Sequence, residues 1–78
     1  MSDLPQSDVR AMQLRHLEEA ERHIAEGERH IAEQEDRIAD LARLGHDLAE
    51  AKILLENFYA SQMLHIQHRD RIRRELGR

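Results

Sequence analysis

The side chains best suited to chemistry in this sequence are its histidines, which make up six of 78 residues. His65 and His68 are three residues apart, so a helix would place both imidazoles on one face. An antiparallel neighbour would bring His23 and Glu26 towards them. Two or three imidazoles with one carboxylate form a donor set that suits zinc or a similar divalent ion. The candidate metal ligands are therefore His23, Glu26, His65 and His68.

A simpler interpretation places the histidines on a solvated helix surface. His23 and His30 each follow an acidic residue by four positions, the order that favours a helix. We prefer this interpretation and expect no bound cofactor, because long acidic helices bring His and Glu together by chance. The Glu-x-x-His motif of di-metal helical bundles is absent from the sequence. A response to protonation of the histidines near about pH 6 is a further alternative.

Groups suited to catalysis are sparse. Ser61 and His65 are four residues apart, but the sequence offers no third group to orient the imidazole. It also contains no glycine-rich phosphate-binding loop. We therefore predict a protein without enzymatic activity.

The C-terminal segment, residues 65–78, has the composition of a nucleic-acid contact, with five arginines and two acids. Arg71, Arg73 and Arg74 would contact the phosphates of RNA or DNA. Two observations count against this alternative. The net charge of the chain is −4, and an antiparallel hairpin would pair these arginines with the acidic residues at 18–21.

Helices must position all of these residues. The chain has no Cys, Thr or Trp and only 3% aromatic residues, whereas Ala, Leu, Glu, Arg and Gln are abundant. The acidic N-terminus does not resemble a secretory signal, and the apolar runs are too short to cross a membrane. The absence of cysteine fits a reducing compartment. We expect a cytoplasmic location.

A heptad repeat dominates the first half of the chain. Its a positions are Leu17, Ile24, Ile31 and Ile38, and its d positions are Ala20, Gly27, Gln34 and Leu41. A 3.5-residue apolar repeat sustained over four heptads indicates a helix packed along another helix. Gln34, and Gln62 further on, interrupt apolar stripes, and we interpret them as residues that fix the register of the two helices.

The predicted fold is all-α: an antiparallel, coiled-coil-like helical hairpin in a single domain, residues 1–78. One helix spans about 7–44, a turn spans 45–47, and a second helix spans about 48–76. The turn is so short that the helices must fold back on each other.

Local signals support these boundaries. Asp3 or Ser7 is a suitable N-cap for the first helix, and Gly45 suits the left-handed position after its C-terminus. Asp47 and Glu50 read as a capping pair for the second helix. A turn centred on residues 45 and 46 predicts these neighbours: Ile38 with Ile53, Ile31 with Ala60, and Gly27 with Leu64. Residues 1–12, with Val9 and Met12, would then extend beyond the second helix.

The second helix carries more apolar residues than one partner helix can cover. Its main stripe is Leu48, Ala51, Leu55, Phe58, Gln62, His65, Arg69, Ile72 and Leu76. Ile53, Leu54, Tyr59, Met63, Leu64 and Ile66 lie off that stripe. The surplus needs a second partner, so we expect two hairpins to form a homodimeric four-helix bundle. The candidate core and interface residues are Leu17, Ile24, Ile31, Ile38, Leu41, Leu48, Leu55, Phe58, Tyr59, Ile66 and Ile72.

Three segments, AERHIAEGERHIAE, GHDLAEAKILLENF and HIQHRDRIRRELG, resemble small helical-hairpin proteins of proteobacteria to which no function is attached. In these proteins an ERHIAEG-like repeat precedes a GHD turn and an RDRxxRELG-like end. The resemblance covers roughly residues 13–78 and implies a naturally occurring helical hairpin. Together, these observations predict a structural or protein-interaction module, a homodimer that engages another protein.

Overall fold

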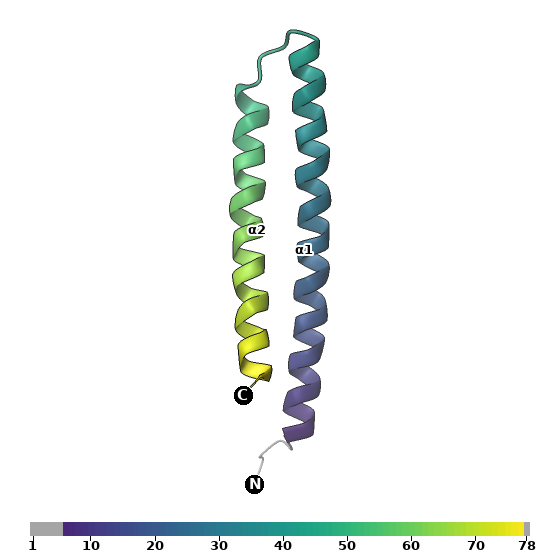
Figure 1. Ribbon diagram of the computed structural model, residues 1–78, viewed down its shortest axis with the longest axis vertical. Helices are drawn as coiled ribbons and strands as arrows, with labels where there is room; N and C mark the ends of the chain where they lie inside the picture. The colour runs from purple at the N-terminus through teal and green to yellow at the C-terminus, as the bar shows by residue number, and fades with distance from the viewer. Residues whose placement is uncertain (1–5, 78) are drawn as a thin grey trace.

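Two long antiparallel helices form the protein in a computed structural model that describes residues 6–77 (Figure 1). Helix α1 spans Gln6–Arg43 and helix α2 spans Ala49–Leu76. The helices pack against each other along the length of α2, and the end of α2 lies beside the first turns of α1. The predicted all-α helical hairpin is confirmed, with observed helix boundaries within one residue of the predicted ones.

The C-terminus of α1 is closed by the glycine that the sequence predicts. Gly45 has a φ of 77°, in the left-handed region. The His46 N–H donates to the Leu41 carbonyl at 2.9 Å, and the Gly45 N–H donates to the Ala42 carbonyl at 3.1 Å. These two bonds form a Schellman motif, which satisfies carbonyls that the end of a helix leaves free.

The start of α2 differs in detail from the prediction. The N-cap residue is Leu48, whose side chain makes no capping hydrogen bond. Asp47, one residue earlier, accepts a hydrogen bond from the Ala49 N–H at 3.0 Å. The predicted role of Asp47 as N-cap, paired with Glu50, is therefore wrong, although its carboxylate does satisfy the first amide of the helix.

The first turns of α1 also correct one prediction. The helix begins at Gln6, so Ser7 lies inside it and does not cap it. The alternative cap, Asp3, lies outside the described residues. Val9 and Met12 are each 39% exposed, as expected for apolar residues near the free end of α1.

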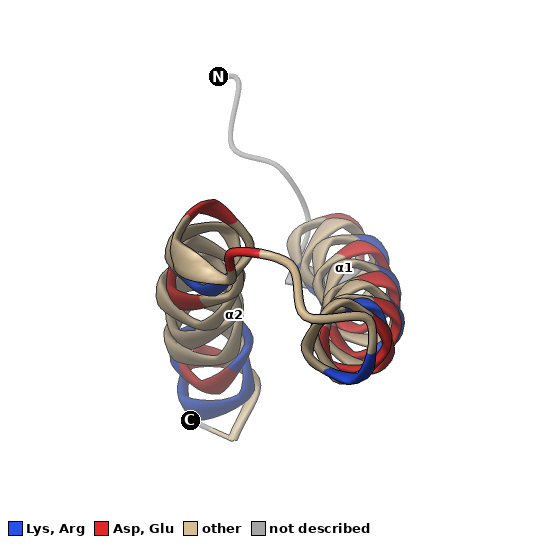
Figure 2. Ribbon diagram, turned by 90° about the horizontal axis from the view of Figure 1, so that it is seen from above, with Lys and Arg blue, Asp and Glu red and all other residues tan. Residues whose placement is uncertain are grey.

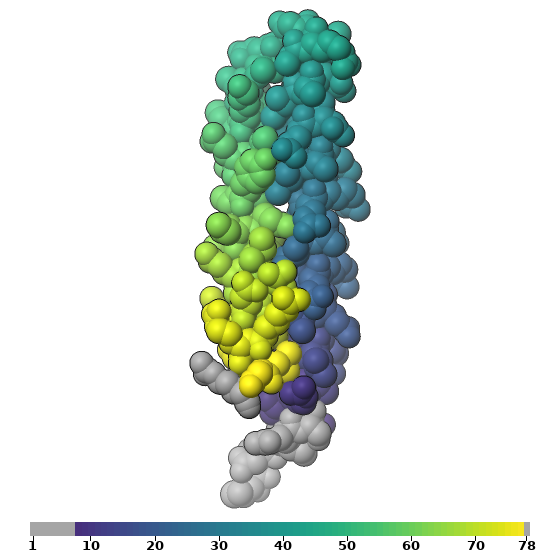
Figure 3. Space-filling view, in the orientation of Figure 1, coloured from purple at the N-terminus to yellow at the C-terminus, as the bar shows by residue number. Residues whose placement is uncertain are grey.

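The core of the hairpin is a thin seam. Its buried residues are Ala20, Ile24, Gln34, Gln62 and Ile72. The other predicted a, d and main-stripe residues are half-buried. The radius of gyration is 18.3 Å, against about 11.5 Å for a compact chain of this length. An extended shape of 65 × 20 × 14 Å therefore leaves most side chains within reach of solvent (Figure 3).

One predicted core residue lies outside the seam. Tyr59 is 46% exposed, whereas the other ten predicted core or interface residues are buried or half-buried. Neither of the two described helices is long and apolar enough to cross a membrane.

Candidate functional site

Two buried glutamines tie the helices together reciprocally. Gln34 on α1 donates from Nε2 to the Ala51 carbonyl of α2 at 2.9 Å. Gln62 on α2 donates from Nε2 to the Ile24 carbonyl of α1 at 2.8 Å. Each glutamine is only 7% exposed. Because a shift along the seam would break both bonds at once, this pair supports the register role expected for the two glutamines.

Gly27 makes room for one of these amides. A Cβ atom at this position would lie 2.7 Å from Gln62 Cδ and would overlap Gln62 Oε1. The prediction that Gly27 makes room for Leu64 is therefore wrong. Leu64 is 66% exposed and lies on the outside of α2.

The loop explains this difference in register. Residues 46–48 are not helical, and they run from the top of α1 down to the start of α2 (Figure 1). Non-helical chain covers up to about 3.5 Å per residue, compared with about 1.5 Å in a helix. Helix α2 consequently starts lower along α1 than a symmetric turn would place it, and Gln62 replaces Leu64 beside Gly27.

Two side chains near the start of α1 contact the last turn of α2. Arg10 donates from Nη1 to the Leu76 carbonyl at 3.4 Å, and Gln13 donates from Nε2 to Glu75 Oε2 at 2.9 Å. The first turns of α1 extend past the end of α2 (Figure 1), as expected for the predicted overhang of residues 1–12, of which residues 1–5 lie outside the described residues.

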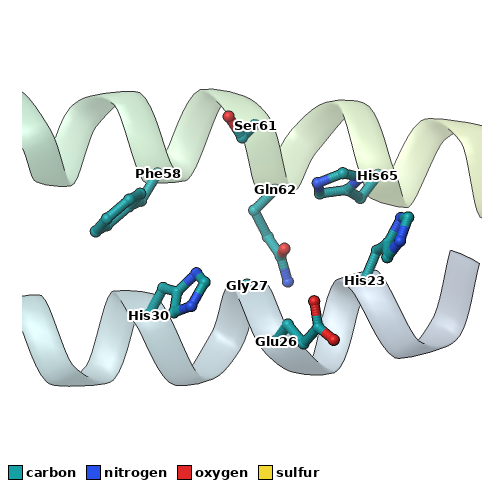
Figure 4. Close-up of a pocket in the computed structure, with 8 residues that line it drawn as sticks. All are labelled: His23, Glu26, Gly27, His30, Phe58, Ser61, Gln62 and His65. Carbon is teal, nitrogen blue, oxygen red and sulfur yellow. The ribbon is translucent and has the colours of Figure 1, made fainter.

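A hollow of about 360 Å³ lies between the helices around Gln62 (Figure 4). Its lining residues are His23, Glu26, Gly27, His30, Phe58, Ser61, Gln62 and His65. The rings of His23 and His65 meet edge to face, with centroids 5.4 Å apart and an angle of 60° between the planes. His30 and Phe58 pack at 5.7 Å on the other side. Gln62 Oε1 is buried here without a hydrogen-bond partner.

This arrangement does not assemble the predicted metal ligands. His23, Glu26 and His65 share the lining of the hollow, whereas His68 is exposed and does not line it. Among residues 6–77, no group of three or more His, Cys, Asp or Glu side chains is placed to share a metal ion. A closed zinc site needs four ligands and a catalytic one needs three from the protein.

Ser61 and His65 also line this hollow (Figure 4). An activated serine needs a base that a third group orients. The ring in contact with His65 is that of His23, an imidazole and not a carboxylate.

The arginines proposed for nucleic-acid contact, Arg71, Arg73 and Arg74, are all exposed on α2. The expected ion pairs between the helices do not form in the described residues. The ion pairs found there all lie within one helix: Arg29 with Glu33, Arg43 with Asp40, and Arg69 with Asp70. Arg69 does line a small hollow together with Glu21 and Glu28, so acidic residues of α1 lie near this end of α2.

One face of α2 is exposed and largely apolar, with Glu56 as the charged residue between Ile53 and Ala60. We define the α2 outer face as Ala49, Ile53, Ala60, Met63 and Leu64. Ile53 and Met63 are each 58% exposed and Leu64 is 66% exposed; the two alanines are also exposed. Charged residues run along the outward side of α1, whereas α2 has longer uncharged stretches (Figure 2). An apolar surface of this kind typically marks a contact with another protein.

The exposed side chain of Tyr59 forms a hydrogen bond between the two helices. Its hydroxyl donates to Glu35 Oε2 on α1 at 3.1 Å. The hydrogen bond to Glu35, followed by desolvation and the charge of Glu35, raises the pKa of the Tyr59 phenol above 10.0. Sequence reasoning missed this contact and the packing of His30 on Phe58, because both depend on the register that the loop sets.

No family model, curated protein or solved structure matches this chain.

Proposed function

We propose that the chain is a non-enzymatic protein-interaction module, which acts as a homodimer of helical hairpins and engages another protein. The observation that supports this proposal is the α2 outer face. Three large apolar side chains, Ile53, Met63 and Leu64, are more than half exposed on it.

The thin core supports the same proposal. Small chains bury a limited share of their surface and often depend on association for stability. Here Ala20, Ile24 and Ile72 are the buried apolar residues of the described chain. Covering the α2 outer face with a second hairpin adds apolar burial where one hairpin has little. The charged outward side of α1 stays available to another protein.

The test is the oligomeric state of the protein in solution. We expect the wild-type chain to sediment as a dimer at micromolar concentration. Leu64→Asp should shift the equilibrium towards monomer, because it places a charge in the apolar contact. Ala32→Asp is the matched control: it adds the same charge to an exposed position on α1 and should leave the dimer intact.

Circular dichroism separates loss of association from loss of folding. Leu64 does not contribute to the seam between α1 and α2, so the helix content of Leu64→Asp at high concentration should stay close to that of Ala32→Asp. A wild-type chain that is monomeric throughout the micromolar range would overturn the proposed homodimer. Equal dissociation of both variants would assign the effect to charge alone and not to the α2 outer face.

A metal- or pH-responsive hairpin is the second candidate function, and the contact between His23 and His65 supports it. The test is native mass spectrometry of protein purified without chelator. A stoichiometric metal adduct that His23→Ala and His65→Ala both abolish would favour this candidate. Retention of the adduct in both variants would place the metal elsewhere.

A further inference from the structure

We propose that the α2 outer face binds a second copy of this chain in antiparallel orientation, centred on Ala60, with the two α2 helices inside and the two α1 helices outside. This inference rests on the proposed homodimer and adds its direction and layout. The predicted compact four-helix bundle and this flatter arrangement bury different faces of α2.

The position of the exposed apolar residues favours the flatter arrangement. Residues two positions apart on a helix point about 200° apart. Ile53 is two positions from the seam residue Leu55, and Leu64 is two positions from the buried Gln62. Both side chains therefore point away from α1, and a partner that covers them must approach from the side of α2 opposite α1.

Ala60 lies at the middle of this face. It is seven residues from Ile53 and seven from Gln67, so all three lie on one stripe of α2. A two-fold axis at Ala60 pairs this alanine with its own copy, where the small side chain lets the helices approach closely. The same axis sets Ile53 against the partner's Gln67.

Charge sets the antiparallel direction. The loop half of the hairpin, residues 33–56, carries seven acidic and three basic side chains. The other end, residues 8–22 with 69–75, carries seven arginines and six acids. A parallel dimer would place the two acidic loop halves side by side. An antiparallel dimer places each acidic half beside the end that has more basic residues, and such complementarity fixes orientation more than affinity.

Individual side chains beside the α2 outer face agree with this direction. With the axis at Ala60, Lys52 lies near the partner's Asp70, and Glu50 lies near the partner's Arg71. Antiparallel helices bring the same flank of each helix together, and Lys52 and Asp70 are eighteen residues apart, which is five whole helical turns. Both therefore lie on the same flank of α2, so the opposite charges meet in pairs across the dimer.

The absence of cysteine from the chain makes the test direct. Single-cysteine variants Ala60→Cys, Ile53→Cys and Gln67→Cys are oxidised alone and as a mixture. A disulfide needs Cα atoms within about 7 Å. We expect Ala60→Cys to cross-link with itself, and Ile53→Cys to cross-link with Gln67→Cys in the mixture. Ile53→Cys should not cross-link with itself, because the antiparallel arrangement separates the two copies by about 21 Å.

The outcomes separate this inference from the proposed function. Efficient self-cross-linking of Ile53→Cys would show a parallel dimer, which overturns the orientation and leaves the homodimer standing. A dimer by native mass spectrometry in which none of the three positions cross-links would overturn the use of the α2 outer face. A monomeric wild-type chain would overturn both. Ala32→Cys, on the outward side of α1, is the matched control and should remain uncross-linked.

Discussion

The contact between Gly27 and Gln62 predicts that Gly27→Ala changes the free energy of unfolding in opposite directions with and without the Gln62 side chain. Replacing a glycine in the interior of a helix by alanine normally stabilises the helix by about 1 kcal/mol. Here a Cβ atom at Gly27 would overlap the amide of Gln62. We expect Gly27→Ala to give no gain, or a loss, in the wild-type chain and a gain of about 1 kcal/mol in the Gln62→Ala background.

The size of this effect depends on the interactions that the Gln62 amide loses when a Cβ atom at position 27 displaces it. Gln62 is 7% exposed and donates to the Ile24 carbonyl at 2.8 Å. Expelling it breaks a buried hydrogen bond worth about 0.5–1.5 kcal/mol and removes its packing from the seam. The unpartnered Gln62 Oε1 recovers some free energy when it reaches water. The coupling between the two substitutions should therefore be about 1–2 kcal/mol.

The assay is a double-mutant cycle by urea unfolding, followed by circular dichroism at one fixed protein concentration, since association affects apparent stability. Gly45→Ala is the matched control. Its φ of 77° strains any residue with a Cβ, and no atom lies within 4 Å of that Cβ, so its cost should be the same with Gln62 or Ala at position 62. A Gly27→Ala effect that is equal in both backgrounds would refute the assigned contact.

Two further predictions test the seam and the hydrogen bond between Tyr59 and Glu35. Ile72→Ala should destabilise the hairpin by about 2–4 kcal/mol in urea unfolding, because Ile72 is 4% exposed. Ile53→Ala should weaken the dimer, as measured by sedimentation, and leave the unfolding free energy of the isolated hairpin almost unchanged. The Tyr59 phenol should titrate above pH 10.0 by ultraviolet absorbance, and Glu35→Gln should lower its midpoint. Because the folded pKa is the raised one, the stabilisation from this hydrogen bond is complete below pH 10.0 and is lost as the pH rises through the folded pKa. A titration midpoint of Tyr59 that Glu35→Gln does not change would contradict the hydrogen bond between Tyr59 and Glu35.

The sequence predicted the helices and their facing stripes well, because these depend on local periodicity. The a and d residues between Leu17 and Leu41 are all buried or half-buried, as is every residue of the main stripe of α2. Gly45 closes α1 as its left-handed preference predicts. These features need only the spacing of apolar residues and one glycine.

The neighbours across the seam could not be predicted as well. The sequence does not reveal how far residues 46–48 run along the hairpin axis, and this length decides which residues face each other. An error of about two residues in the predicted register placed Leu64 beside Gly27, where the structure has Gln62. A similar shift of three residues sets His65, and not the predicted His68, against His23, so His68 does not join the other proposed metal ligands.

The two glutamines explain how a thin seam still selects one register. Rows of Ile, Leu and Ala would pack acceptably after a slip of one heptad, because apolar contact has no direction. Gln62 donates to the Ile24 carbonyl and packs against Gly27. A slip of one heptad would set it against Ala20 or Gln34, where a Cβ atom would occupy the space of its amide. The two glutamines therefore reduce the apolar burial in the seam but select a single register of the two helices. Three large apolar residues that the seam does not use, Ile53, Met63 and Leu64, lie on the α2 outer face, where a defined register presents them to a partner.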